Sequence, residues 1–426
     1  MTISAFGLPA MAQTTDEIEA LRAEIRQLRA EVETLKSEKS DPAIAELERR
    51  IDILTRAIES IDTGRSRASA DQYQAGLGQA ASKVYRSDLG LSFGGYGEMV
   101  YENRESSNDQ IDFLRAILYT GYKFSDRVVF NSEIEFEHAT SGDGIGEVSV
   151  EFAYLDFMLR PEASIRAGML LVPMGLVNEL HEPTAFLGVM RPTVERSVIP
   201  STWRENGLGL YGESGSLSYR AYLINGFRGE EFGSGGLRGG RQSGGKAIAN
   251  DFAFVGRLDW APAEGLLFGG SVYSGDSGQD LPIDVSTTIL ELHGMASLRG
   301  WSFRALWADA SVDDVAELNG LLGLTGAASV GEDLGGWYAE VGYDLTTMMR
   351  FGESSITPFV RYEQVDTQKS VPSGFSRNPA NDQEILTIGV SWKPIPQTIF
   401  KADYQLIEIG TGDENRQFNL GLGYIF

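Results

Sequence analysis

The histidines of this chain offer little for catalysis or metal binding. There are three histidines among 426 residues, and there is no cysteine. His138 falls beside a predicted loop, His181 lies within another, and His293 falls on a predicted strand. None has a second ligand at the short spacing typical of a zinc site, and the lack of cysteine removes thiolate sites and disulfides. We therefore expect no enzyme activity, no catalytic residues, no metal and no cofactor.

Charged side chains instead recur at every second position of segments that read as strands. The clearest segment alternates Val128, Phe130, Ile134 and Phe136 with polar residues, as a strand with one apolar and one polar face does. Six arginines fall on polar faces, opposed by acids such as Glu151, Glu363 and Asp403. As pore-lining wall residues we predict Arg115, Glu133, Glu135, Arg166, Arg220, Arg257, Arg304 and Arg361. Arginine and acid patches facing each other across water would orient dipolar solutes.

A second set of charges lies in one long connection, residues 173–206. Prolines and opposite charges interleave there, which suits a fixed, ion-paired segment better than a mobile surface loop. We predict that it folds inward and narrows a pore, although an ordered outer loop packed on itself or on a neighbouring subunit is the alternative. The predicted constriction residues are Glu179, His181, Glu182, Arg191, Glu195, Arg196, Arg204 and Glu205.

The elements that must position these residues are strands of a membrane barrel. The last segment, Phe418 to Phe426, has an apolar residue, mostly aromatic or leucine, at each even position. From Asp88 onward we count sixteen such alternating segments, and no apolar run is long enough for a membrane-spanning helix. Lipid leaves no water for backbone groups, so a sheet in a membrane must close on itself. The sequence predicts a sixteen-stranded antiparallel transmembrane β-barrel, its last strand paired with its first.

Connection lengths support the same architecture. Short turns, such as 125–126 and 299–300, alternate with long connections such as 173–206 and 310–334. Outer-membrane barrels alternate short periplasmic turns with long outer loops, and an even strand count places both termini in the periplasm. A soluble β-sandwich would not carry this asymmetry along the whole chain. Barrels of this size leave an aqueous lumen, and nothing before the first strand looks like a plug.

The first 87 residues divide into three parts. Residues 1–12 resemble the end of a signal peptide, with Ala10 and Ala12 at an A-x-A cleavage site. Residues 13–62 carry two heptad seams separated at Ser40–Pro42, which predicts a periplasmic coiled coil or, alternatively, a helical hairpin. Residues 63–87 read as a linker, and the barrel covers 88–426. The core of the first coil segment comprises Ile18, Leu21, Ile25, Leu28, Val32 and Leu35.

One stretch resembles a known family. Ile165 to Gly175, followed by Glu195-Arg196-Ser197, is similar to the porin O/porin P family of phosphate-selective porins. The resemblance implies an N-terminal coil, sixteen strands, a homotrimer and an inward loop after strand five. It implies a porin more strongly than phosphate transport, because that family uses a ladder of arginines and lysines. Here residues 88–426 carry 24 Lys and Arg against 46 Asp and Glu.

These features predict an outer-membrane porin for passive diffusion of small hydrophilic solutes or ions, with weak cation preference or little selectivity. The alternatives are an anion- or phosphate-selective porin and a structural anchor that tethers the outer membrane to the cell wall through the coil. The expected partners are the lipid bilayer, lipopolysaccharide bound through divalent cations at the acidic outer loops, and two further copies of the chain. Peptidoglycan is a possible partner of the coil, and no nucleic acid is expected.

Overall fold

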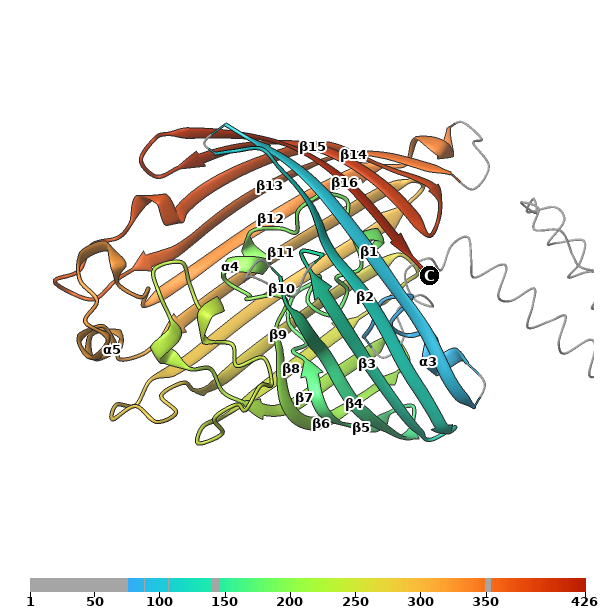
Figure 1. Ribbon diagram of the computed structural model, residues 1–426, viewed down its shortest axis with the longest axis horizontal. Coiled ribbons are helices and arrows are strands. Elements are labelled where there is room, and N and C mark those ends of the chain that lie inside the picture. The colour runs from blue at the N-terminus through green and yellow to red at the C-terminus, as the bar shows by residue number, and fades with distance from the viewer. Residues whose placement is uncertain (1–75, 88, 106, 140–145, 349–353) are drawn as a thin grey trace, which may run out of the picture. The chain divides into compact units, whose positions relative to one another are not determined.

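The computed structural model describes residues 76–87, 89–105, 107–139, 146–348 and 354–426, and within them the predicted sixteen-stranded antiparallel barrel is confirmed (Figure 1). Every strand pairs with its neighbour in sequence, and β16 closes on β1 with Tyr424 opposite Gly97 and Phe418 opposite Asn103. The predicted signal peptide and coiled coil lie outside the described residues. The strands are β1 (Gly90–Arg104), β2 (Gln110–Ser125), β3 (Val128–Glu137), β4 (Val148–Arg160), β5 (Ala163–Leu171), β6 (Arg204–Ser214), β7 (Leu217–Asn225), β8 (Phe252–Trp260), β9 (Leu266–Asp276), β10 (Ser286–Leu298), β11 (Trp301–Val312), β12 (Asp333–Tyr343), β13 (Ser355–Ser370), β14 (Asp382–Ile395), β15 (Thr398–Ile409) and β16 (Glu414–Ile425).

Short helices occur in the connections. They are α3 (Lys83–Arg86), α4 (Val194–Ser197) and α5 (Val315–Leu322), with 3-10 turns η1 (Pro183–Ala185), η2 (Gly229–Glu231), η3 (Arg238–Gly240), η4 (Gly326–Ala328), η5 (Leu345–Thr347) and η6 (Pro379–Asn381). None of the helices in the described part of the chain has the length and apolar character needed to span a bilayer.

The outer face of the barrel is apolar, as the alternation predicts. Large hydrophobic side chains stay exposed along the strands, for example Leu292 at 61% and Phe268 at 48%, because they face outward. The alternating positions are buried inside the barrel. In β13, Phe359, Arg361 and Glu363 are each at most 3% exposed. This is the inverse of a soluble protein surface and is what a barrel surrounded by lipid requires.

The predicted facing of β4 is wrong beyond its first residues. We expected Phe152 and Tyr154 to face lipid together with Val148 and Val150, but Phe152 and Tyr154 are buried inside. The reason is a β-bulge: Glu133 pairs with Phe152 and Ile134 pairs with Val150, which leaves Glu151 as an extra residue. A bulge turns two consecutive side chains to one face and shifts the alternation after it. Leu155 and Phe157 therefore face outward instead.

Loop lengths mostly alternate as expected, but the connection after β12, expected to be short, spans residues 344–354, and the one after β1, expected to be long, spans only 105–109. The connections after β2, β4, β6, β8, β10 and β14 are short, and those after β5, β7 and β11 are long. The connection between β15 and β16, expected to be long, is reduced to the residues between Ile409 and Glu414 because both strands extend further than the sequence indicates. In Figure 1 the long loop that carries α5 lies at the left and the C-terminus at the right, at opposite ends of the barrel.

The outward face predicts a specific mutational response. Leu292 lies in the middle of β10 and faces outward, so L292R would place a charge near the centre of the membrane. We expect a loss of about 2–4 kcal/mol in the free energy of unfolding, measured in lipid vesicles by urea titration. The control is L321R in α5, whose leucine is also exposed but sits in a loop, where the effect should stay within about 0.5 kcal/mol. Equal effects would contradict a lipid-facing position for Leu292.

Candidate pore constriction

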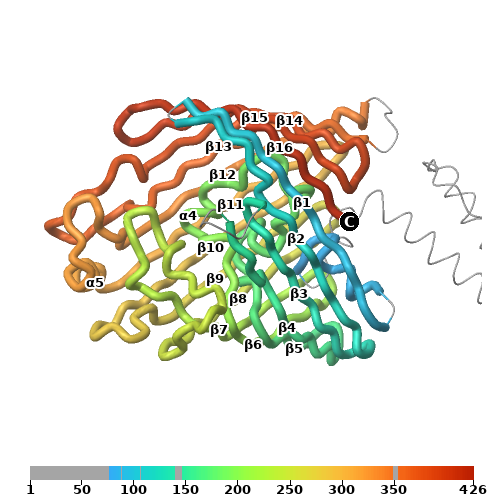
Figure 2. Tube along the Cα trace, in the orientation of Figure 1, coloured from blue at the N-terminus to red at the C-terminus, as the bar shows by residue number. Residues whose placement is uncertain are grey.

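The connection from β5 to β6, residues 172–203, lies inside the barrel. Its helix α4 contacts β12 and β13 and lies within the outline of the barrel in the ribbon and in the Cα trace (Figures 1 and 2). Along its course it contacts inward residues from strands spread around the wall. The Ala185 carbonyl accepts from Arg304 of β11, the Val189 amide donates to Asp403 of β15, and His181 approaches Glu133 of β3, which is eight strands away from β11 around the barrel. A segment with neighbours on opposite sides of a barrel must cross its lumen.

Wall side chains satisfy the backbone of this inner loop. The amides of Val189 and Thr193 donate to the carboxylates of Asp403 and Glu363, each at 2.6 Å. Several carbonyls accept from wall side chains in return. These contacts are Lys393 to Thr184, Arg304 to Ala185, Ser391 to Leu187, Lys401 to Gly188, Arg361 to Met190 and Arg257 to Gly175. A loop without its own ladder needs such partners when it is buried, so the polar inner face of the wall holds the loop in place.

Two residues fix the shape of the loop. Asn178 joins its ends: its amide nitrogen donates to the carbonyls of Val172 and Trp203, and its oxygen accepts from the Trp203 amide at 2.7 Å. Glu195 is completely buried and accepts from the amides of Leu176 and Val177, at 2.7 Å each, and from the Tyr338 hydroxyl at 2.6 Å. Burial raises the pKa of Glu195, and the hydrogen bond from Tyr338 opposes this.

The predicted constriction residues fall into three groups. Glu179, Glu182 and Glu195 are buried and bonded: Glu179 pairs with Arg220 at 3.2 Å, and Glu182 accepts from two backbone amides. Arg204 and Glu205 belong to the start of β6 rather than to the loop. Arg204 pairs with Glu151 at 2.6 Å, and Glu205 accepts from the Gln242 amide at 2.8 Å. His181, Arg191 and Arg196 form the third group, described below.

The predicted wall residues all point inward, but most are covered and paired. Arg361 is 1% exposed and lies between Glu340 and Glu363. Arg220 and Arg257 share Asp259, and Arg304 donates to the inner loop. Arg166 pairs with Asp156, and Arg115 pairs with Glu98 while lying 4.0 Å from Glu135. The arginines therefore bind wall acids and loop carbonyls and do not form an open ladder.

A second inner segment corrects the expectation that nothing before the first strand enters the lumen. Residues 76–87 pack against the inner faces of β1 to β5. The Tyr85 hydroxyl donates to Asp156 at 2.5 Å, and Asn131 donates to the carbonyl of Ala81 at 2.8 Å. Val84 fills the space beside Gly121, where a Cβ would lie 2.6 Å from it. The sequence reads this stretch as linker because it is too short for periodicity.

Arginines from two loops gather where the inner loop is least covered. Arg196 is exposed and Arg191 is partly exposed, but Nε and one terminal nitrogen of Arg191 are buried and have no hydrogen-bond partner among the described residues. In the 226–251 connection, burial and then the charges of Arg241, Arg196 and Arg191 lower the pKa of Arg238. Arg238 and Arg241 donate to the carbonyls of Ser201 and Thr202. Among these four loop arginines, Arg196 and Arg238 are the most exposed to water.

Asn178, Tyr338 and Tyr85 hold the inner layer together but were not predicted as site residues. Each acts through a partner far away in the sequence, so no local pattern identifies it. The sequence gives only a weak indication of their role. Tyr338 and Asn178 are polar residues at an inward strand position and in the inner loop, close to residues that were predicted as site residues.

No family model matches the chain. An uncharacterised protein of Aquifex aeolicus (strain VF5) is 39% identical over 368 residues, which cover 83% of this chain and 84% of that protein. This chain belongs to the same family. The match extends over most of both chains, so the family comprises the barrel and not an isolated segment of it.

Solved structures that resemble the chain are outer-membrane β-barrels. The anion-selective porin of Comamonas acidovorans is 10% identical, with 79% of this chain and 99% of that chain covered and a TM-score of 0.53. OmpF of Salmonella typhi, in complex with daunomycin, is 13% identical, covers 79% and 97%, and has a TM-score of 0.53. OmpT of Vibrio cholerae, described as a trimer form, is 13% identical, covers 80% and 100%, and has a TM-score of 0.50. The chain therefore has the fold of outer-membrane porins.

The anchoring role of Glu195 can be tested by removing one acceptor. E195Q replaces a carboxylate oxygen with an amide that cannot accept, so one of its three buried donors loses its partner. We expect the free energy of unfolding to fall by about 1–3 kcal/mol, measured in detergent. The control is E317Q on the exposed face of α5, which should change it by less than about 0.5 kcal/mol. An unchanged stability of E195Q would contradict the anchoring role.

Proposed function

We propose that this protein is an outer-membrane porin through which small hydrophilic solutes or ions diffuse passively. The observation that carries the proposal is the loop 172–203 held inside a closed sixteen-stranded barrel by wall side chains. A wall this large encloses more space than its own side chains fill, and an ordered inner loop then sets the width of the water-filled path. The likeness to solved porins supports a channel rather than an enzyme, and an outer-membrane location.

Selectivity follows from which charges meet the solute. Most wall arginines are paired with wall acids or donate to loop carbonyls, so their charges act mainly within the protein. We place Arg196, which is exposed, and Arg191, which is partly exposed, next to the remaining path. This arrangement favours a second candidate, an anion-preferring porin. It does not require the phosphate selectivity implied by the porin O/porin P resemblance, which remains a narrower form of the same candidate.

Recordings in planar bilayers test whether the inner loop narrows the path of the solutes. Deleting residues 180–200 should raise single-channel conductance, because it removes most of the inner loop and keeps Asn178, which joins the two ends of the loop. Neutralising the two arginines in R191Q/R196Q should shift the reversal potential toward cations, because anions lose an attractive field. We expect a shift of several millivolts in a tenfold salt gradient.

The matched control for the charge change is R416Q. Arg416 is exposed on β16, on the opposite face of the strand from the inward residue Asn419. This variant should leave both conductance and reversal potential unchanged. Unchanged conductance on deletion would place the loop outside the permeation path. A wild-type current that millimolar phosphate blocks would establish the phosphate-selective form.

We further propose that the chain assembles as a homotrimer and that the coiled coil of residues 13–62 lies in the periplasm and strengthens the assembly. The trimer form of Vibrio cholerae OmpT and the heptad seams support this. I25D/L28D places charges in the first seam and should weaken self-association, because burial of that stripe drives pairing. Cross-linking in mild detergent measures it, with E24Q at a position outside the core as control.

A monomeric wild-type protein under these conditions would contradict the assembly. Binding of the protein to purified peptidoglycan, lost in the same double variant, would instead support the tethering role, in which the barrel serves as an anchor.

A further inference from the structure

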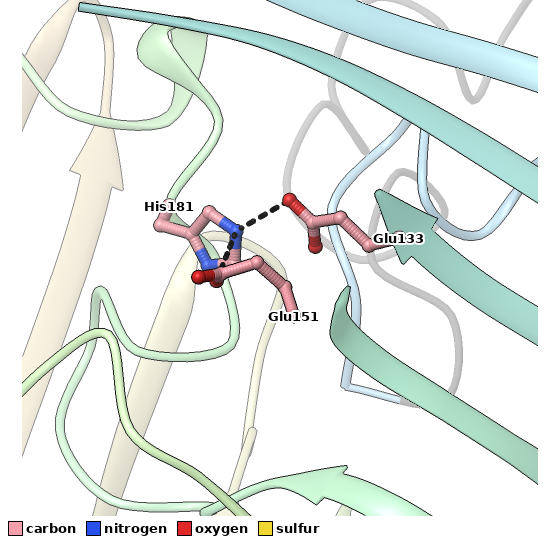
Figure 3. A group of neighbouring side chains, drawn as sticks. All are labelled: Glu133, Glu151 and His181. Carbon is pink, nitrogen blue, oxygen red and sulfur yellow. Dashed lines mark hydrogen bonds and ion pairs between the residues drawn. The ribbon is translucent and has the colours of Figure 1, made fainter. Parts of the chain in front are cut away.

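A cluster of three ionisable side chains lies inside the barrel: Glu133, Glu151 and His181. The contacts that hold the inner loop to the wall do not account for this cluster. Glu133 comes from β3, Glu151 from β4 and His181 from the inner loop (Figure 3). One potential ligand atom from each lies within 4.8 Å of the others. The three side chains are at most 2% exposed. Sequence spacing could not indicate this group, because its members are far apart along the chain.

The imidazole ring is oriented by a backbone carbonyl. His181 Nδ1 lies 2.8 Å from the carbonyl oxygen of Asn178, which can only accept, so Nδ1 carries a proton and donates it. The other nitrogen, Nε2, faces the carboxylates, 3.2 Å from Glu133 Oε1 and 3.9 Å from Glu151 Oε2. Asn178 is itself held by both ends of the loop. A ring fixed through Nδ1 with Nε2 directed at carboxylates is the usual arrangement of a metal-binding histidine.

The carboxylates of Glu133 and Glu151 each have one oxygen that is buried and has no hydrogen-bond partner within the described part of the chain, Oε2 in both cases. Arg204 takes the other oxygen of Glu151 at 2.6 Å. Within the described chain, the ion-pair partner of Glu133 is His181. Buried polar atoms without a partner are costly, so this oxygen-rich space calls for a positive group.

The bulge in β4 is what builds this geometry. Because Glu151 is the extra residue, it turns inward together with Phe152, next to Glu133 on the neighbouring strand. Without the bulge, the regular alternation would direct Glu151 and Phe152 to opposite faces. Bulges commonly re-aim a side chain beside a functional site.

We propose that Glu133, Glu151 and His181 bind one divalent transition-metal ion, with Zn²⁺ as the probe that tests it. One imidazole nitrogen and two carboxylate oxygens form a common ligand set for zinc, leaving a fourth position for water. Ligand atoms around tetrahedral zinc lie roughly 3.3 Å apart, so the 3.2 Å separation fits and small side-chain rotations bring in Glu151. The ion would join the inner loop to β3 and β4. The site does not depend on what passes through the pore.

The experiment uses the full-length protein purified in detergent and treated with a chelator. Zn²⁺ is titrated by calorimetry and by competition with a chromophoric chelator, and the unfolding temperature is followed with and without the metal. We expect one ion per chain and a higher unfolding temperature with Zn²⁺. E133Q and H181N should each weaken binding by about 100-fold or more and abolish the thermal shift.

The chain offers a matched control in H293N. His293 is also buried between two carboxylates, but Glu291 contacts its Nδ1 at 2.6 Å and Asp259 its Nε2 at 2.9 Å, so they lie on opposite sides of the ring and cannot share one ion. This variant should bind Zn²⁺ as the wild type does. If H181N does not fold, E133Q, which keeps the shape of the side chain, decides alone.

Two results would overturn the site. One is the absence of saturable Zn²⁺ binding to the wild type in the micromolar range, with E133Q changing only the unfolding temperature, which would make the group an imidazolium–carboxylate pair. The other is retention of full affinity in both E133Q and H181N. Neither result bears on the bilayer conductance that tests the channel.

Discussion

Every part of this structure depends on one constraint, that a backbone amide or carbonyl removed from water needs a hydrogen-bond partner. In the wall the constraint is met by closing the sheet, so that β16 pairs with β1 and no edge strand faces lipid. Inside the barrel the same constraint applies to the loop 172–203, which has no sheet of its own. Its amides and carbonyls are therefore satisfied by charged and polar side chains that the strands direct inward.

This constraint changes how the charges of the wall are understood. A row of inward arginines reads, from the sequence, as a surface that solutes meet. In the folded protein, Arg304 and Arg257 donate to loop carbonyls, and Asp403 accepts from a loop amide. Arg361 lies between two carboxylates and is almost fully buried. The wall charges thus hold the inner loop in position, and Arg196 in that loop is exposed.

The sequence predicts the barrel well because its determinant is local. Two-residue alternation and loop length can be read without knowing the fold, and both lead to sixteen strands and to an inward loop after β5. The errors arise where one residue changes the alternation or where partners are distant. A single extra residue at Glu151 reverses the facing of Phe152 and Tyr154. Residues 76–87 are too few to show a period, yet Tyr85 and Val84 fit the inner wall closely.

The candidate site shows the same division. That Glu133 faces inward and that His181 lies in the inward loop follow from the pattern. That they meet depends on the course of the loop through the lumen and on the bulge in β4, neither of which has a local signature. Spacing rules for metal ligands work when one helix or turn supplies the ligands. They do not apply when a strand, its neighbour and a crossing loop each supply one.

The two inner segments are joined to each other, not only to the wall. Glu182 accepts hydrogen bonds from the amides of Ala80 and Ala81, at 2.9 and 3.1 Å, and the preceding residue, His181, contacts Glu133 and Glu151. Two consecutive loop residues therefore bind the N-terminal segment on one side and strands β3 and β4 on the other. Because Glu182 is buried, breaking its contacts would leave a carboxylate without partners in a dry environment. Residues 76–87 cannot leave the lumen without disturbing the inner loop, so these two segments form one mechanical unit.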